Sequence, residues 1–391
     1  MPWMELLPMD AKILFIGDWI RNGHKNLSAL CREHGISRKT GYKWTRRYQS
    51  RGQNGLQEQS RRPANSPYRV SYAIRRAIID CARRFPDWGP KKLMVILRSN
   101  NPEWDIPSRT TVYNILKKEG LVKPRHIRKR LITGIRPFAA ASTPNAVWSA
   151  DFKGQFATRD RSLCYPLTVM DQASRFLLSC HIAASTRLEE TKAEFERLFR
   201  EYGLPERIRT DNGVPFASTA DCGLSRLSIW WLQLGIIPER IEPGKPQQNG
   251  RHERMHRTLK KESINPPAQS RKQQQELFDA FRQSYNHQRP HEAIEMKVPA
   301  SVYYRSQRQM PVKPLPMEYP GHFDRAFVNH NGCIFRQGKA VYITCLLKGE
   351  TVGLEEIDNG IFDVYYGPLK LGLFKERVLS TNNQYVRLLH L

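Results

Sequence analysis

Apolar residues recur at helical spacing in the first third of the chain, in segments that start at a capping residue or a proline. Residues 10–49 hold three such segments, with Gly35 as a turn and Ser37 as the expected cap of the third. A second trio is expected at residues 71–85, 90–100 and 108–119. The pattern therefore predicts two small helical domains joined by a polar stretch.

Strand and helix patterns alternate in the middle of the chain. Three runs with strand character come first and helices then separate the later strands, in the order β-β-β-α-β-α-β-α-α. Such an order predicts a mixed sheet. The expected elements are residues 147–156, 164–170, 176–182, 188–202, 208–211, 224–234, 236–241, a helix from residue 251, and 276–287.

Residues 323–391 change character again. Short alternating runs are separated by turn signals such as Asn331-Gly332 and Asp358-Asn359-Gly360. A small β-barrel is the expected structure, with strands at residues 326–335, 339–347, 351–357 and 361–366. The predicted fold is therefore multidomain, α plus α/β plus β, with domains at residues 1–58, 59–137, 138–305 and 320–391.

The charge is unevenly distributed. The 391 residues carry a formal net charge of +26, and residues 1–137 hold 29 Lys and Arg against 10 Asp and Glu. Such a basic segment indicates a polyanionic partner, and double-stranded DNA suits two small helical domains. A basic membrane-binding surface is the alternative, but no apolar run approaches the ~20 residues of a membrane span.

The third helix of the first domain is the main candidate for DNA binding. A turn containing glycine before a capped basic helix is typical of the helix-turn-helix, in which the second helix enters the major groove. A small bundle with a basic surface is the alternative. The expected DNA-binding residues on this helix are Arg38, Lys39, Lys43, Arg46 and Arg47.

Further basic residues lie between and within the two helical domains. Residues 51–67 read as a linker in which Arg61 and Arg62 resemble a short arm for the minor groove, or simply a solvated tether. In the second domain, which we expect to be winged-helix-like, Arg109 and Lys117 should face outward from the helix capped by Ser108. Two modules on one chain raise affinity through effective concentration.

Three acidic residues stand where a metal site would need them. Asp151 lies in a buried strand, Asp211 ends a short strand, and Glu253 lies in the first turn of a helix. A two-metal phosphoryl-transfer site needs about three converging acids. On that helix Glu253 shares a face with Arg257 and Lys260, so an ordinary ion pair between Glu253 and Arg257 is the alternative.

The segments around these acids carry a resemblance to a known family. They resemble the three signatures of the D, D, E polynucleotidyl transferase core of retroviral integrases and bacterial transposases, with 42 positions between the last two acids. The whole chain is most similar to bacterial insertion-sequence transposases of the type numbered four-eight-one. The segments are Trp148-Ser149-Ala150-Asp151-Phe152-Lys153-Gly154, Thr210-Asp211-Asn212-Gly213 and Gln248-Asn249-Gly250-Arg251-His252-Glu253-Arg254-Met255-His256.

The resemblance implies a fold and a chemistry. The core would be RNase H-like with its first and fourth strands adjacent, and the C-terminal barrel would be of the SH3 type, holding DNA or a neighbouring subunit; a purely structural cap is the alternative. Asp151, Asp211 and Glu253 would hold two Mg²⁺ ions, with Mn²⁺ as a substitute, for cleavage at the transposon 3′ ends and strand transfer into target DNA.

Several side chains near the acids receive expected roles. Lys245, Arg257 and Lys260 are expected to contact phosphates, and Asn212 and Gln248 to position groups near the site. His252 and His256 are expected to contact DNA or solvent, because metals would supply the activation.

The remaining expectations concern partners, compartment and rival functions. Joining two transposon ends requires two active sites, so we expect a dimer or larger assembly on DNA. Seven scattered cysteines without a C-x-x-C pair, and a start unlike a signal peptide, favour a cytoplasmic protein associated with the nucleoid. The rivals are a DNA-binding regulator with an inactive core, and a nuclease that cuts without joining.

Overall fold

The computed structural model describes residues 8–58, 70–122, 138, 141–217, 224–242, 246–313, 316–376 and 386–388. The chain divides into two compact units, Met1–Val70 and Ser71–Leu391. Within the described residues, no helix is long and apolar enough to cross a membrane.

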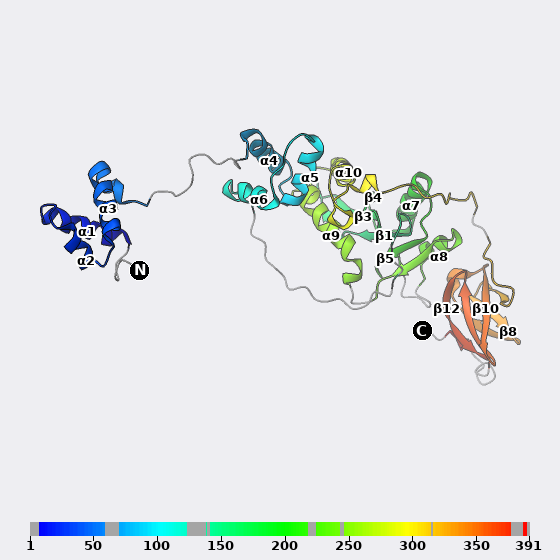
Figure 1. The fold of residues 1–391 in the computed structure, drawn as a ribbon. Coiled ribbons are helices and arrows are strands. Elements are labelled where there is room, and N and C mark those ends of the chain that lie inside the picture. The colour runs from blue at the N-terminus through cyan, green and yellow to red at the C-terminus, as the bar shows by residue number, and fades with distance from the viewer. Residues whose placement is uncertain are drawn as a thin grey trace. The chain divides into compact units, whose positions relative to one another are not determined.

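The first unit is a three-helix domain of helix-turn-helix type. Its helices are α1 (Pro8–Arg21), α2 (Leu27–Glu33) and α3 (Arg38–Arg51) (Figure 1). As predicted, Ser37 caps α3, and its side chain accepts a hydrogen bond of 3.2 Å from the backbone N–H of Thr40. The helices enclose a core of Phe15, Ile16, Trp19, Leu30, Cys31, Ile36, Trp44 and Leu56.

The expectation of a linker from residue 51 is wrong at its beginning. A short 3-10 helix, η1 (Gly52–Leu56), folds back onto the domain and buries Leu56. The fold-back depends on a glycine, because a Cβ atom at Gly55 would lie 2.2 Å from the carbonyl oxygen of Arg47. The rest of the expected linker, with Arg61 and Arg62, lies outside the described residues except at 57 and 58.

The second helical trio follows the predicted boundaries closely. It consists of α4 (Tyr72–Arg84), α5 (Pro90–Asn100) and α6 (Arg109–Lys118). Ser108 caps α6 by accepting a hydrogen bond of 3.4 Å from the N–H of Thr111. The buried residues of this trio are Ile78, Ala82, Trp88, Leu93, Leu97, Ile106, Val112 and Leu116.

A mixed six-stranded sheet forms the centre of the second unit. The strand order is β2-β3-β1-β5-β6, with β4 also paired to β3. The parallel pairing of β1 with β5 confirms the expected adjacency of the first and fourth core strands. The strands are β1 (Val147–Phe152), β2 (Phe156–Ala157), β3 (Leu163–Asp171), β4 (Leu177–Ala183), β5 (Arg207–Thr210) and β6 (Ile237–Arg240).

One boundary in this sheet differs from the prediction. A single strand was expected over residues 147–156, but strand geometry stops at Phe152 and resumes only at Phe156. The break places Asp151 next to the last residue of β1 rather than in its middle. Helix α10 also begins five residues earlier than expected.

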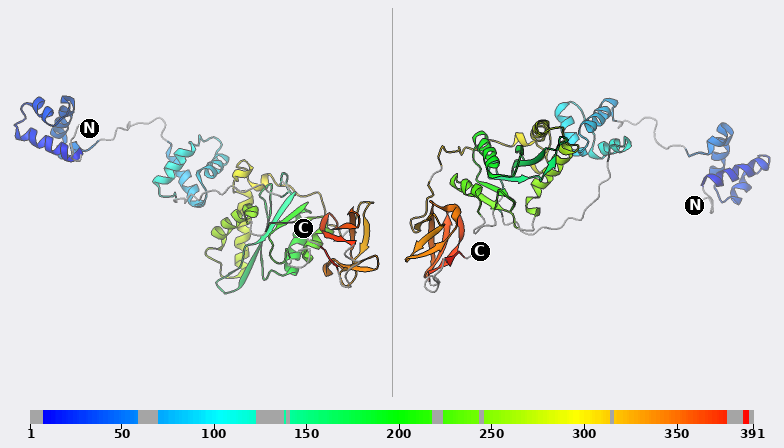
Figure 2. Two further views of the ribbon diagram at one scale, coloured as in Figure 1. Left: turned by 90° about the horizontal axis from the view of Figure 1, so that it is seen from below. Right: turned by 180° about the vertical axis from the view of Figure 1, so that it is seen from behind.

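Helices cover both faces of the sheet (Figure 1, Figure 2). On one face, Trp148, Ala150 and Leu167 pack with α7 (Leu188–Tyr202) and α8 (Arg226–Gln233). On the other face, Met170 and Leu177 pack with α9 (Gly250–Leu259), the following π-helical turn η4 (Lys260–Ile264) and α10 (Arg271–His287). Because side chains alternate along a strand, the residues between the apolar ones of β1 point toward α9.

Helix α10 also protects the edge strand β4. Asn286 accepts from the N–H of Leu177 and donates to its carbonyl oxygen, at 2.8 and 2.9 Å. Gln275 binds the same strand further along. It accepts a hydrogen bond from the N–H of Ile182 and donates one to the carbonyl oxygen of Cys180. These side chains replace a neighbouring strand, which an exposed edge would otherwise attract.

The C-terminal residues form two sheets. One has the order β12-β11-β10-β7 and the other β13-β9-β8. The pairing of the described strands does not close into a ring, so the expected barrel stays a prediction. The strands are β7 (Asp324–Phe327), β8 (Cys333–Arg336), β9 (Lys339–Tyr342), β10 (Thr351–Asp358), β11 (Ile361–Tyr366), β12 (Leu369–Lys375) and β13 (Val386–Arg387).

Candidate active site

Asp151 is placed by the alternation of β1. Trp148 and Ala150 are fully buried on the α7 side of the sheet, so Ser149 and Asp151 project from the opposite face, toward α9. The side chain of Asp151 is 17% exposed. Directly across the antiparallel pair, Thr168 of β3 is the Cα partner of Asp151.

Asp211 comes directly after β5, the parallel neighbour of β1. Its carboxylate Oδ1 accepts a hydrogen bond of 3.0 Å from the backbone N–H of Gly213, which holds the turn that follows the strand. The carboxyl ends of two parallel neighbours meet at one edge of a sheet, so this pairing brings Asp211 to the same edge as Asp151.

Glu253 lies in the first turn of α9, on the exposed face of that helix. Arg257 of α9 and Lys260 at the start of η4 are exposed as well. The helix is anchored near its start by Arg251, whose guanidinium donates a hydrogen bond of 3.0 Å to the carbonyl oxygen of Gln172.

The electrostatics of Asp151 tie the three acids together. The pKa of Asp151 is raised to about 7, mainly by burial and in addition by the nearby charges of Asp211 and Glu253, against the lowering effect of Lys153. Like charges disfavour each other's ionisation only when they are close. Asp211 and Glu253 therefore lie close enough to Asp151 to disfavour its ionisation.

The two histidines of α9 contradict the expectation that they contact DNA or solvent. His252 is completely buried and His256 is 5% exposed. Burial lowers the pKa of His252 to about 3 and places the pKa of His256 far below its ordinary value. Both imidazoles are therefore neutral at physiological pH, and both lie beneath the carboxylates.

A pattern in the sequence could have revealed this burial. His252, Met255, His256 and Leu259 follow the spacing i, i+3, i+4, i+7, which marks one face of a helix. Met255 and Leu259 are core residues, so the two histidines share the core-facing stripe.

Side-chain hydroxyls of β1 and β3 form hydrogen bonds with the two imidazole rings. The hydroxyl of Thr168 lies 2.7 Å from Nε2 of both His252 and His256, and it donates a hydrogen bond of 3.1 Å to the carbonyl oxygen of Asp151. Nδ1 of His252 lies 2.6 Å from the hydroxyl of Ser149. Nδ1 of His256 faces Oδ2 of Asp151 at 3.7 Å.

The neighbouring acid Asp171 and the amide side chains of Asn212 and Gln248 have structural partners. Asp171 is buried at the end of β3 and accepts hydrogen bonds from the N–H groups of Asn145 and Ser174, both at 2.7 Å. This turn accounts for the buried carboxylate of Asp171. Asn212 and Gln248 both bind the backbone after β6, at Ile241 and Glu242, so they hold the loop that leads to α9.

The basic residues of α3 form a surface of their own. Arg38, Lys39, Lys43 and Arg46 are exposed, whereas Arg47 is half-buried with its guanidinium 5.1 Å from the ring centre of Trp44. A groove of about 780 Å³ follows this helix. Its lining consists of Lys39, Tyr42, Lys43, Arg46, Arg47, Ser50 and Arg51.

The other basic residues that we expected to bind DNA fall into two groups. Arg109 and Lys117 are exposed on α6, in agreement with their expected outward direction. Arg61, Arg62 and Lys245 lie outside the described residues.

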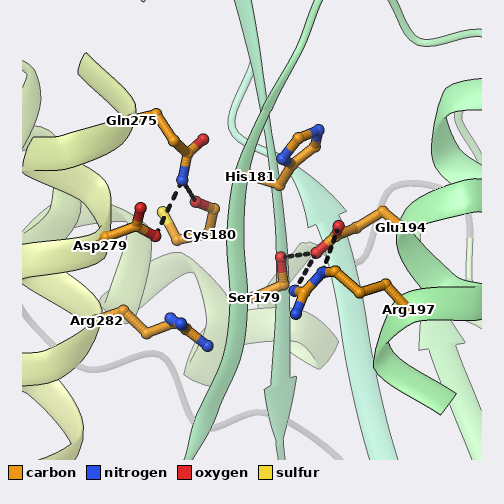
Figure 3. A pocket seen from close by; sticks show the side chains of 8 residues that line it. All are labelled: Ser179, Cys180, His181, Glu194, Arg197, Gln275, Asp279 and Arg282. Atoms are coloured by element: carbon orange, nitrogen blue, oxygen red, sulfur yellow. Dashed lines mark hydrogen bonds and ion pairs between the residues drawn. The ribbon is translucent and has the colours of Figure 1, made fainter. Parts of the chain in front are cut away.

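A polar cavity of about 220 Å³ lies between β4, α7 and α10, away from the three acids (Figure 3). Two of its charged side chains are paired, because Glu194 accepts hydrogen bonds from Ser179 at 2.5 Å and from Arg197 at 2.6 Å. Burial raises the pKa of Cys180 well above its usual value, so the thiol is not a nucleophile.

The donors around Asp151 suit a divalent cation. Carboxylate oxygens are the ligands that Mg²⁺ and Mn²⁺ prefer. Within the described part of the chain, Asp151, His252 and His256 form a group that could hold a metal, since one donor atom of each lies within 4.8 Å of the others. The residues present therefore fit a divalent metal at this edge of the sheet.

Comparison with known families agrees with this architecture. Residues 141–246 and 234–299 each match an integrase core domain. Residues 12–64 match a helix-turn-helix domain, and residues 40–116 match a homeodomain-like domain.

Individual relatives come from bacterial insertion elements. The chain is 29% identical over 265 residues to the insertion element IS476 uncharacterized 39.2 kDa protein of Xanthomonas euvesicatoria, covering 65% of this chain and 72% of that protein. It is also 29% identical over 196 residues to the insertion element IS407 uncharacterized 31.7 kDa protein of Burkholderia multivorans, covering 48% of this chain and 66% of that protein.

Among solved structures, the HTLV-2 integrase catalytic core domain in complex with magnesium is 16% identical. The superposition covers 41% of this chain and 98% of that one, with a TM-score of 0.33. A score this low carries no argument about the chain.

Proposed function

We propose that this integrase-core transposase of the insertion-sequence type binds the terminal inverted repeats of its element and transfers their 3′ ends into target DNA. The observation that carries the proposal is the electrostatic coupling of Asp151 to both Asp211 and Glu253. Three acids from three separate elements have no structural need to converge, and a phosphoryl-transfer site does need them together.

Asp151, Asp211 and Glu253 would hold the two Mg²⁺ ions, which when bound supply Lewis-acid activation and charge stabilisation for in-line displacement at phosphorus. The protein's own part is to fix these carboxylates on two adjacent strands and one helix. Arg257 and Lys260 would bind the phosphates that flank the scissile bond, because both are exposed beside Glu253 on the same stretch of helix. Lys245, which precedes this helix in the sequence, would add a third such contact.

DNA recognition would belong to the helical domains. Exposed Arg38, Lys39, Lys43 and Arg46 lie on one short helix that follows a turn, which is the geometry of a recognition helix. Arg47 would contribute only in part, because it stacks on Trp44. A second contact by Arg109 and Lys117 of α6, and the arm with Arg61 and Arg62, would extend the recognised site.

The other parts of the proposal concern organisation. The functional domains would be residues 1–58, 59–137, 138–305 and 320–391, with an SH3-type barrel as the last. Joining two ends would require a dimer or larger assembly on DNA. Mn²⁺ would replace Mg²⁺, since both take carboxylate ligands.

The test is metal-dependent cleavage and joining of a labelled duplex that carries the element's own terminal repeat. The native chain is compared with Glu253→Gln and with Glu276→Gln, an exposed acid on α10 that serves as the matched control. We expect joined product from the native and control chains and a loss of at least roughly 10²-fold for Glu253→Gln, the scale of losing a group that acts only in the transition state.

The same assay separates the rival functions. Cleavage without joining would indicate a nuclease, and tight binding without cleavage would indicate a regulator with an inactive core. Equal activity of the native chain and Glu253→Gln would remove Glu253 from the site.

A further inference from the structure

We propose that Nδ1 of His256 is a direct ligand of the divalent cation held by Asp151, so that this metal site contains one imidazole nitrogen besides its carboxylates. The inference rests on the proposed function, because it concerns the same metal site. It is carried by the hydrogen bonds behind Asp151 and by one distance.

The first step is to place the single proton of the Thr168 hydroxyl. This hydroxyl has one proton to donate and two lone pairs to accept with. It donates to the carbonyl oxygen of Asp151 at 3.1 Å, which leaves its lone pairs for the two Nε2 atoms at 2.7 Å. Both His252 and His256 then carry their proton on Nε2.

The second step follows for His252. With its proton on Nε2, Nδ1 of this ring must accept, and the Ser149 hydroxyl donates its one proton to this atom at 2.6 Å in preference to the carbonyl oxygen of Met170 at 3.3 Å. The Ser149 oxygen in turn accepts from the side-chain amide of Gln172 at 2.5 Å. Every polar atom of His252 is thus satisfied within the protein, and this ring has no lone pair left for a metal.

The third step concerns His256. A neutral imidazole protonated on Nε2 presents a bare lone pair at Nδ1. That lone pair faces Oδ2 of Asp151 at 3.7 Å, which is too far for a hydrogen bond. Two ligands of one cation with bonds of ~2.1 Å lie roughly 3–4 Å apart, so the distance fits a shared ion.

The hydrogen bond at Nε2 of His256 is of the kind that metal-binding histidines make. A ligating histidine usually donates its other N–H to a fixed acceptor, which sets the tautomer and orients the ring. Thr168 provides that acceptor. His256 is only 5% exposed, so the packing around it also restricts the orientation of the ring. Lys153 is the alternative partner of the Asp151 carboxylate, because its positive charge could balance that of Asp151 without a metal ion.

A histidine ligand would change which divalent metal the site prefers. An imidazole nitrogen suits Mn²⁺ and other transition metals better than Mg²⁺, which prefers oxygen ligands and holds its waters. The site should therefore bind Mn²⁺ more tightly than Mg²⁺ by at least roughly tenfold, with the excess depending on His256.

The direct test is pulsed electron paramagnetic resonance of the full chain loaded with one equivalent of Mn²⁺. Chains grown with ordinary and with ¹⁵N-labelled histidine are compared, so the native fold itself is measured. We expect a modulation from a directly bound histidine nitrogen that changes with the isotope. His256→Gln should abolish it, and His287→Gln, an exposed histidine at the end of α10, should leave it unchanged.

Each other outcome contradicts the inference. Bound Mn²⁺ without isotope-dependent modulation would show that His256 is not a ligand, and it would leave the proposed carboxylate site intact. Modulation that persists in His256→Gln would assign the nitrogen to another residue. Failure of the native chain to bind Mn²⁺ at all would contradict both this inference and the proposed function.

Discussion

Thr168 lies directly across the sheet from Asp151, and its hydroxyl donates a hydrogen bond of 3.1 Å to the carbonyl oxygen of Asp151. The same oxygen atom of Thr168 is the partner of two buried imidazoles. One hydroxyl therefore connects the strand that carries the first acid with the helix that carries the third.

Replacing Thr168 with valine keeps the shape of the side chain and removes this connection. The Nε2 atoms of His252 and His256 would lose their partner in a buried site, which costs about 1–3 kcal/mol for a group left unpaired. We expect Thr168→Val to lower the free energy of unfolding of the core by that amount, measured by urea denaturation.

The matched control for this variant is Thr258→Val. The hydroxyl of Thr258 donates to the carbonyl oxygen of Arg254 on the outer part of α9, where water can replace it. Its loss should change the free energy of unfolding by less than about 0.5 kcal/mol. Equal effects of the two substitutions would show that the buried network contributes nothing.

The raised pKa of Asp151 predicts how stability depends on pH without metal. The pKa of this carboxyl is about 7 in the folded chain, against an ordinary value of 3.8. Between these values the folded state binds more protons than the unfolded state, so the stability conferred by the protonated carboxyl is lost as pH rises toward 7.

The measurement is urea unfolding in a metal chelator at several pH values from about 5 to about 8. We expect the native chain to lose stability more steeply over this window than Asp151→Asn, which has no proton to release. Parallel curves for the two chains would mean that the pKa of Asp151 is not raised by the fold.

The edge strand supplies a prediction about folding rather than chemistry. Asn286 of α10 binds both backbone groups of Leu177 in β4, a strand that pairs with β3. Asn286→Ala should make the Leu177 amide exchange with deuterium at least roughly tenfold faster, because each lost hydrogen bond to a buried group costs about 1–3 kcal/mol. Gln273→Ala, exposed on the same helix, should leave that rate unchanged.

The exposed basic residues of α3 lead to a prediction about DNA affinity. The triple variant Lys39→Gln, Lys43→Gln, Arg46→Gln removes three exposed charges from α3. The slope of log affinity against log salt should become shallower by about 0.9 for each lost phosphate contact, measured on duplex DNA by fluorescence anisotropy. Arg32→Gln, an exposed charge on α2, is the control, and an equal slope in both variants would remove α3 from the interface.

Much of this architecture is predictable from the sequence because it depends on local signals. Ser37 and Ser108 cap their helices as expected, since a hydroxyl before a basic or apolar helical run binds the free N–H groups of the first turn. The order of strands and helices in the core is equally local. The adjacency of β1 and β5 was expected only from the family resemblance, because spacing does not determine which strands pair.

The parts that escaped prediction depend on contacts between distant segments. His252 and His256 were expected at the surface because they are polar. In the fold, the hydroxyls of Ser149 and Thr168 form hydrogen bonds with the two rings in the core, and the sequence does not reveal these contacts. The fold-back of Gly52–Leu56 likewise depends on the core that α1 and α3 share, in which Leu56 is buried. A polar composition does not reveal such packing.

The central claim is that Asp151, Asp211 and Glu253 form one divalent-metal site. The most direct test is the dissociation constant of Mn²⁺, measured by electron paramagnetic resonance of the free ion for the native chain and for Asp151→Asn, Asp211→Asn, Glu253→Gln and the control Glu276→Gln. Each of the three site variants should raise the constant by roughly tenfold or more, as losing one charged ligand does, and the control should leave it unchanged. A native constant matched by any of the three would exclude that residue from the site and contradict the claim.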